Sequence, residues 1–156
     1  MSKDLAIITS KLDGIDISKI VDYSNKVKEI SNLSAGASSL YLQEFIVAFD
    51  LASSALSIAM RCEAEAKTAL DEARAEAYFD RAGAYLEEKR IKETSEARKK
   101  FEDIDPAVIK AKDVYSRSEA SVALFKNKVM MFRYAYEAIK KVYYSGNNDS
   151  MPFEGM

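Results

Sequence analysis

The feature that most constrains this chain is a mostly apolar stripe in its last third, in which the spacing alternates between three and four residues. The stripe consists of Val108, Ala111, Tyr115, Ser118, Val122, Phe125, Val129, Phe132, Tyr136, Ile139 and Tyr143. A stripe that repeats every 3.5 residues stays on one side of an α-helix only if the helix supercoils around a partner. The spacing therefore predicts one helix from Pro106 to Tyr144, about 55–60 Å long at 1.5 Å per residue, packed against another helix.

A second long helix is expected from about residue 40 to residue 82. Apolar residues recur at helical spacing from Leu42 through Phe45 and Phe49, and alanines dominate the second half of the segment. A charged connection of some twenty residues follows, which makes antiparallel packing of the two helices the simplest arrangement. Asp105 and Pro106 mark the start of the last helix, because aspartate accepts from free backbone N–H groups and proline loses no bond at the first helical position.

These patterns predict an all-α, elongated, antiparallel long-helix hairpin of coiled-coil type over residues 39–144. Residues 1–38 are expected to hold a short N-terminal helix and a hinge of small residues, and residues 145–156 a flexible tail. The stripe also supplies the residues expected to mediate homo-oligomerisation. They are Val122, Phe125, Val129, Phe132, Tyr136 and Ile139. The spacing leaves open whether the partner helix lies in the same chain or in another copy.

Composition argues against an enzyme. The chain has 156 residues, a single cysteine, Cys62, and no histidine, so an internal disulfide is impossible and an ordinary zinc site lacks its ligands. No glycine-rich phosphate loop or nucleophile turn is present. We therefore expect no catalytic residue, no metal and no cofactor. No segment approaches 18 uninterrupted apolar residues, which predicts a soluble cytoplasmic protein that contacts no membrane.

Nucleic-acid binding must depend on local patches, because the formal net charge is −2. The first patch lies in the last helix, where basic residues are interleaved with aromatic ones. Its members are Lys126, Lys128, Arg133, Tyr134, Lys140 and Lys141. Basic side chains can follow phosphates while aromatic rings stack on unpaired bases, so the pattern favours single strands. Tyr134 and Tyr144 are the free aromatic residues, since Phe132, Tyr136 and Tyr143 belong to the stripe.

The second patch lies in the charged connection. It includes Lys89, Arg90, Lys92, Arg98, Lys99 and Lys100. A solvated charged surface is the simpler interpretation of this run. Yet the run contrasts with residues 62–88, where acids predominate, and such separation of sign would also let one copy dock on another.

The middle of the chain resembles a known family. The order Ala73-Arg74, Tyr78-Phe79, Lys92, Ser95-Glu96, Asp105, Val108-Ile109-Lys110, Phe132 and Ala138-Ile139-Lys140 is similar to the UvsY family, the recombination mediators of T-even-type phages. The resemblance covers roughly residues 64–141. It implies a helical protein that oligomerises through its C-terminal helix, binds single-stranded DNA and helps a recombinase load onto DNA coated by single-strand-binding protein.

The resemblance also implies a DNA contact around Arg74 and the aromatic pair Tyr78 and Phe79. Glu72 stands where the family has a lysine, which shifts the expected contact toward the two basic patches. We therefore expect a non-enzymatic DNA recombination accessory protein whose partners are single-stranded DNA, further copies of itself, and a recombinase or single-strand-binding protein. The alternative is a helical structural or adaptor protein that assembles with proteins and binds no nucleic acid.

Overall fold

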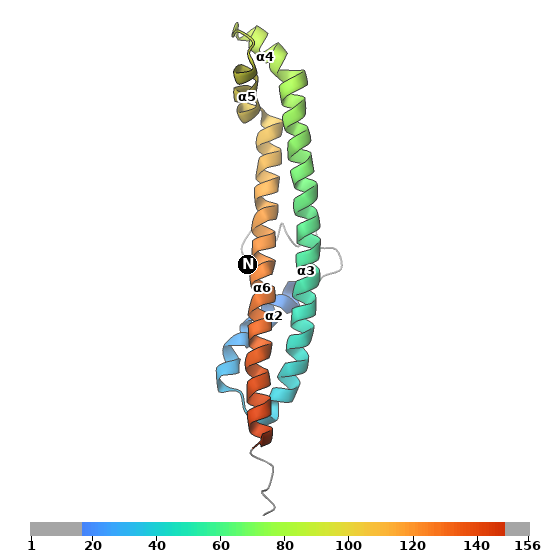
Figure 1. Ribbon diagram of the computed structural model, residues 1–156, viewed down its shortest axis with the longest axis vertical. Coiled ribbons are helices and arrows are strands. Elements are labelled where there is room, and N and C mark those ends of the chain that lie inside the picture. Colours follow the sequence, from blue (N-terminus) through green and yellow to red (C-terminus); the bar gives the residue numbers. More distant parts are fainter. Residues whose placement is uncertain (1–16, 149–156) are drawn as a thin grey trace, which may run out of the picture. The chain divides into compact units, whose positions relative to one another are not determined.

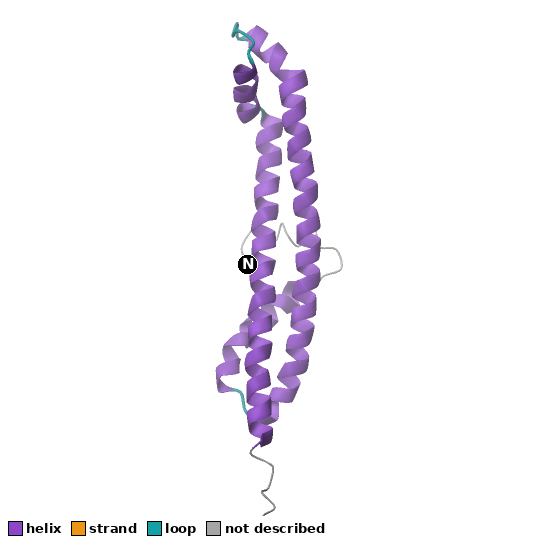
Figure 2. Ribbon diagram, in the orientation of Figure 1, coloured by secondary structure: helices purple, strands orange, loops and turns teal. Residues whose placement is uncertain are grey.

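The computed structural model describes residues 17–148, and these residues form helices joined by short loops, with no strand among them (Figure 2). The elements are α2 (Ile17–Lys26), the 3₁₀-helix η1 (Val27–Asn32), α3 (Ala35–Glu76), the π-helix η2 (Ala77–Arg81), α4 (Ala82–Glu88), α5 (Ser95–Ile104) and α6 (Pro106–Asn148). The all-helical class and the packing of one long helix against another are confirmed (Figure 1).

The chain forms two compact units, and both long helices contribute to each of them. Unit 1 combines the residues up to Ile58 with those from Ala123 onward, and unit 2 comprises Ala59–Val122. The heptad stripe of α6 is buried or half-buried along its whole length in these units. Its partner helix is α3 of the same chain, which answers the question that the spacing had left open.

Unit 1 has a core of aromatic side chains from three helices. The Phe45 ring of α3 lies 6.0 Å from the Phe132 ring of α6, and both approach Tyr23 of α2 at centroid distances of 6.3 and 6.5 Å. Farther along, a Cβ built on Gly146 would lie 2.3 Å from the Cβ of Ala35. Because Phe45 meets Phe132 while the earlier Ala35 meets the later Gly146, α3 and α6 run antiparallel in this unit.

Unit 2 has a smaller core that combines alanines with a few large side chains. Its buried residues are Leu70, Ala77, Ala82, Phe101 and Val108, with Tyr85 and Tyr115 packed at its edge. The Tyr85 and Phe101 rings lie 4.7 Å apart, which joins α4 to α5. The alanines allow close approach of the helices, and the large aromatic groups Tyr85 and Phe101 come from the segments between α3 and α6.

Two helix starts in unit 2 are fixed by side-chain caps. Asp105 Oδ1 accepts from the backbone N–H groups of Ala107 at 2.9 Å and Val108 at 3.1 Å, which confirms the predicted start of α6 at Pro106. Thr94 Oγ1 accepts from the Ala97 N–H at 3.1 Å and caps α5. The sequence predicted a charged connection over this segment, but it did not predict the cap at Thr94.

Several boundaries differ from the sequence prediction. α3 begins at Ala35, so the hinge of small residues is reduced to Leu33 and Ser34, the loop between η1 and α3. Ser38, expected in the hinge, is fully buried in the helix and donates a hydrogen bond to the Ala35 carbonyl. α6 continues to Asn148, so the first four residues of the expected tail, 145–148, are helical. Residues 149–156 of that tail and the first 16 residues of the N-terminal segment lie outside the described residues.

Candidate nucleic-acid interface

The π-helix η2 presents an aromatic pair at the end of α3. Tyr78 is half-buried, and its hydroxyl lies 3.1 Å from Ser95 Oγ at the start of α5. Phe79 meets the Tyr78 ring edge-on at 5.0 Å and keeps 71% of its surface exposed. Tyr78 is thus held by its neighbours while Phe79 offers a ring to solvent. π turns inside helices are frequent at functional sites.

Two guanidinium groups bind the backbone on either side of this turn. Arg98 Nη1 donates to the Tyr78 carbonyl at 2.6 Å, and its guanidinium lies 5.5 Å from the Tyr78 ring centroid. Arg81 Nη2 donates to the Ala73 carbonyl at 3.2 Å. Arg98 also pairs with Glu93. Both arginines are committed to structural contacts, so they contribute less than a free base to any ligand site.

Arg81 also forms a two-bonded ion pair with the cap of α6. Its Nε and Nη2 donate to the two carboxylate oxygens of Asp105 at 2.8 and 3.0 Å, and Asp105 is buried. The hydrogen bonds from Arg81 keep the pKa of the Asp105 carboxyl below its usual value, with help from the N–H groups of Val108 and Ala107, although burial opposes them. The carboxylate therefore stays ionised and ties the π turn to α6.

The loop after α4 and the helix α5 carry a run of exposed cations. Arg90, Lys92 and, on α5, Lys99 are exposed and form no ion pair within the described part of the chain. Lys89 pairs with Glu88 at 3.1 Å, and Lys100 pairs with Glu96 at 2.9 Å. Arg90 has a left-handed backbone conformation in this loop, with φ 57°. We call Arg90, Lys92, Lys99 and Lys100 the loop cluster.

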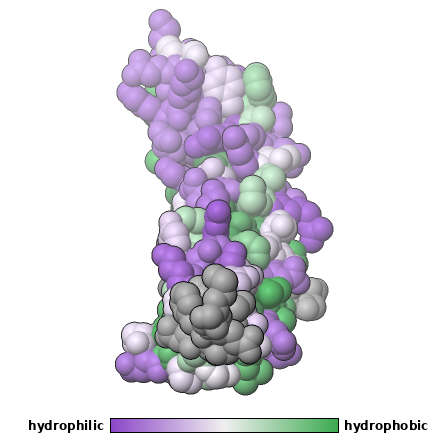
Figure 3. All heavy atoms as spheres, turned by 60° about the horizontal axis from the view of Figure 1, so that its bottom comes forward, coloured by the Kyte–Doolittle hydropathy of each residue, from purple (hydrophilic) through white to green (hydrophobic). Residues whose placement is uncertain are grey.

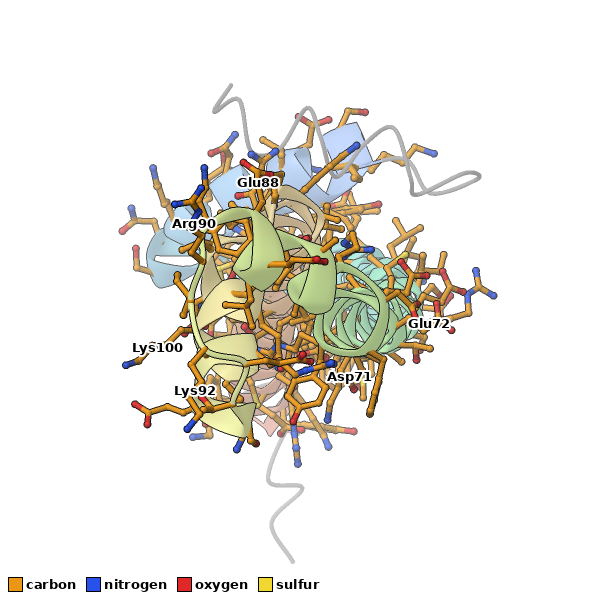
Figure 4. All side chains as sticks on the ribbon, turned by 90° about the horizontal axis from the view of Figure 1, so that it is seen from above. Asp71, Glu72, Glu88, Arg90, Lys92 and Lys100 are labelled. Carbon is orange, nitrogen blue, oxygen red and sulfur yellow. The ribbon has the colours of Figure 1, made fainter. Side chains whose placement is uncertain are left out.

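Charge is distributed unevenly within unit 2. Viewed from above in Figure 4, Arg90, Lys92 and Lys100 lie on one side and Glu72 of α3 on the other, with Asp71 nearer the middle and Glu88 beside Arg90. A polyanion would be attracted to the first side and repelled by the second. Arg74 is exposed on α3, one helical turn before Tyr78, and close in sequence to these acids. Arg74 and the aromatic pair, which the family resemblance connects with a DNA contact, thus lie on successive turns of the same segment.

Unit 1 carries the other predicted patch on α6. Lys126, Arg133 and Lys140 are seven residues apart and so share one side of the helix. Lys126, Arg133 and Lys141 are exposed, Lys140 is half-buried, and Tyr134 is 65% exposed. A shallow hollow near the end of the helix is lined by Glu137, Lys140, Lys141, Tyr144 and Ser145.

The structure separates Lys128 from this patch. Its Nζ donates to Ser24 Oγ of α2 at 2.9 Å, and partial burial lowers the pKa of its ammonium group. On an α-helix, Lys128 points about 160° away from Lys126. The prediction that Lys128 lies with the other bases as a phosphate contact is corrected, because this side chain packs against α2 instead.

The residues expected to mediate oligomerisation are packed inside one copy. Val122, Phe125, Phe132 and Ile139 are 4, 1, 0 and 0% exposed, and Val129 and Tyr136 are half-buried. A second copy cannot reach the four buried side chains without opening the core, whereas Val129 and Tyr136 keep part of their surface accessible.

One exposed surface was missed at the sequence level. Leu42 and Phe49 belong with Phe45 to the apolar pattern that predicted this helix, but Phe49 is 39% exposed, and Leu42 and the later Leu56 are half-buried. The signal was present in the sequence, because Leu42, Ile46, Phe49, Ser53 and Leu56 follow a second 4-3-4-3 spacing beside the buried one. This second spacing is less regular in hydrophobicity than the α6 stripe, because Ser53 interrupts it.

The comparisons with known proteins bring no further assignment: no protein-family model, no curated protein and no solved structure matches the chain. Within the described residues, no group of three or more potential metal-ligating side chains is found.

Proposed function

We propose that this protein is a non-enzymatic accessory protein of phage-type DNA recombination, which binds single-stranded DNA as a homo-oligomer in the host cytoplasm. In this proposal the two long helices pair along their length as one elongated, antiparallel, coiled-coil-like hairpin. A recombinase or a single-strand-binding protein is the further partner that the family resemblance suggests. In this proposal the protein binds the DNA and positions it for its partners, and it uses no cofactor.

The observation that carries the proposal is the loop cluster beside the aromatic pair in unit 2. Among the residues that the structure describes, Arg90, Lys92 and Lys99 have no carboxylate partner, so their charges can attract phosphates. Tyr78 touches the start of α5 through Ser95, which brings Phe79 close to the end of the basic loop. Cations that follow a backbone, next to an exposed ring that can stack on a base, are what a single strand needs from a protein.

The basic side of α6 is a second phosphate-binding surface in the proposal. Lys126 and Arg133 contribute exposed charges, and Tyr134 contributes an exposed ring next to Arg133. Release of counterions from the DNA on binding predicts that affinity falls steeply with salt, by a slope of about 0.7 per neutralised phosphate on a log–log plot.

Fluorescence anisotropy of a labelled single-stranded oligonucleotide, titrated with protein at several salt concentrations, tests the proposal. The double variant Arg90→Glu/Lys92→Glu should weaken binding at least tenfold and make the salt slope shallower. Lys67→Glu/Lys112→Glu is the matched control, because it makes the same charge change on exposed bases outside the two patches. Equal losses of affinity in both variants would show that the effect depends on net charge and not on the loop cluster. No binding by the wild type, or a slope near zero, would refute the proposal.

A helical adaptor protein is the second candidate function, and a specific observation favours it. The apolar residues exposed on α3, including Ile46 at 54% and Phe49 at 39%, suit a protein partner better than DNA. If this is the whole function, Phe49→Glu abolishes assembly while reversal of the loop cluster changes nothing that can be measured.

A further inference from the structure

The N-terminal half of α3 carries an apolar row that the described residues of unit 1 leave at least partly exposed. The row consists of Leu42, Ile46, Phe49, Ser53 and Leu56, and we call it the α3 stripe. Ile46 and Phe49 are 54 and 39% exposed, and the other three are partly exposed. In the same segment Phe45, Ala48 and Ala52 are fully buried. Apolar atoms also reach the surface on the α3 side in the space-filling view (Figure 3).

The spacing of the α3 stripe indicates what kind of surface would cover it. Steps of four and three residues form the seam of a coiled coil, in which side chains fit between those of a facing helix. The stripe borders the buried row directly, since Phe45 precedes Ile46 and Ala52 precedes Ser53. A helix laid on the stripe would therefore extend the existing core of unit 1.

Charge argues against lipid or nucleic acid as the occupant. α3 has no lysine or arginine before Arg61, so this half of the helix attracts neither anionic headgroups nor phosphates. Its two acids are Glu44 and Asp50, and Glu44 is paired with Lys26 at 2.7 Å. The stretch Ala35–Glu88 is long and apolar enough by composition to cross a membrane, with 28% of its most apolar window buried, so lipid is included in the test below.

We propose that the α3 stripe is the surface through which two copies of this chain associate. Asp50 is the one acid on this surface without an ion pair among the described residues. The same surfaces of two copies can therefore face each other with little repulsion, as a two-fold interface requires. Ser53 leaves room within the row for a larger side chain such as Ile46 of the other copy. The homo-oligomer in the proposed function needs such a surface, because the α6 stripe is occupied; to that extent this inference rests on the proposed function.

The exposed area predicts weak, reversible association. A large side chain offers about 150–250 Å² in total, so the exposed parts of Ile46 and Phe49 provide on the order of 150 Å² in each copy. Even with the partly exposed neighbours, a pair stays below the roughly 1,200 Å² of a standard stable interface. The oligomeric state should therefore change with protein concentration.

Sedimentation velocity of the full chain over a hundredfold concentration range tests this inference. The wild type should shift from monomer toward a larger species, and Ile46→Glu/Phe49→Glu should stay monomeric at every concentration. Val47→Glu is the matched control, because Val47 is 48% exposed on the same helix but lies off the stripe. It should associate like the wild type. Circular dichroism confirms that all variants remain helical.

Each outcome bears on one of the proposals. A wild type that is monomeric throughout, or an Ile46→Glu/Phe49→Glu variant that still associates, overturns the self-association surface. Equal disruption by Val47→Glu also overturns it, because the effect would then not be specific to the stripe. Co-sedimentation of the wild type with phosphatidylcholine vesicles, lost in the stripe variant, would identify lipid as the occupant instead. A monomeric variant that still binds the oligonucleotide separates this question from DNA binding.

Discussion

Unit 1 and unit 2 are built from the same two helices but are held together by different means. Unit 1 depends on large buried rings, with Phe45, Phe125 and Phe132 at most 1% exposed. Unit 2 has a core of alanines and a few large side chains, with a single fully packed ring in Phe101, and it adds polar anchors, chiefly the Arg81–Asp105 pair and the caps of α5 and α6. Apolar packing thus determines one unit, whereas hydrogen-bond geometry determines much of the other.

This difference also bears on the two proposed activities, although the basic side of α6 gives unit 1 a part in the proposed DNA binding. The polar anchors of unit 2 hold a π turn and a charged loop, which display cations and an exposed ring for DNA. The apolar core of unit 1 continues onto the surface as the α3 stripe, which we assign to a second copy. The comparison can be tested by removing the characteristic element of each unit.

The largest effect is expected from the aromatic core of unit 1. Phe132→Ala removes a ring that contacts both Phe45 and Tyr23, and it should lower the free energy of unfolding by about 3–5 kcal/mol, because the cavity cannot fully collapse. Urea titration followed by circular dichroism measures this loss. Tyr134→Ala, on the exposed side of the same helix, should cost no more than about 0.5 kcal/mol. Similar losses in both variants would contradict the assigned core.

The next largest loss in the free energy of unfolding is expected from the polar anchor of unit 2, the Arg81–Asp105 pair. Asp105→Ala removes the cap of α6 and the partner of Arg81, and it should cost about 2 kcal/mol. Asp105→Asn should cost less, since asparagine still caps a helix but cannot balance the arginine charge. Hydrogen exchange in the first turn of α6 should accelerate more in the alanine variant than in the asparagine variant.

The same carboxylate predicts a pH dependence. The folded chain holds the pKa of Asp105 below its ordinary value of 3.8, so the unfolded chain binds the proton more readily. The contribution of Asp105 to stability is therefore complete above that ordinary value and is lost as the pH falls through the folded pKa. Asp105→Asn should lose less stability than the wild type over this acid range. An identical pH profile for both would refute the coupling.

The smallest changes in stability are expected from substitutions at two glycines of unit 1, and these changes should have opposite signs. A Cβ on Gly146 would meet the Cβ of Ala35 at 2.3 Å, so Gly146→Ala should destabilise the unit by about 1 kcal/mol or more. Gly36 has nothing within 4 Å of the same position, and Gly36→Ala should stabilise the helix by up to about 1 kcal/mol. Thermal unfolding compares them directly. Equal shifts would show that Gly146 does not pack against α3.

The sequence was most informative where local chemistry or one strong period determines the structure. The heptad stripe predicted α6 and its buried side, and Asp105-Pro106 predicted its first residue. The tertiary contacts that override local preference were not predictable in this way. Gly146 reads as a helix breaker, yet close packing against Ala35 keeps it helical. Lys128 belongs to a basic run, yet Ser24, more than a hundred residues away, determines where it points.

The site was predicted in its composition more than in its geometry. Arg90 and Lys92 were recognised as bases, but only the structure shows which cations lack a carboxylate. The π turn has no sequence signal of its own, because alanine, tyrosine and phenylalanine all fit an ordinary α-helix. The resemblance implied a contact around Tyr78 and Phe79, and the fold shows that Tyr78 is anchored through Ser95 while Phe79 is exposed.

The π-helix at Ala77–Arg81 is also a place where the length of this chain can vary by one residue. A π turn holds one residue more than the α-helical turn it replaces. Deleting a single residue there would restore ordinary α-helix and leave the residues beyond it on nearly the same sides as before. Leu86, now 2% exposed, would stay buried, and Tyr85 would keep its contact with Phe101. A deletion in the regular part of α3 has no such turn to absorb it, and it would rotate everything beyond it by about 100°.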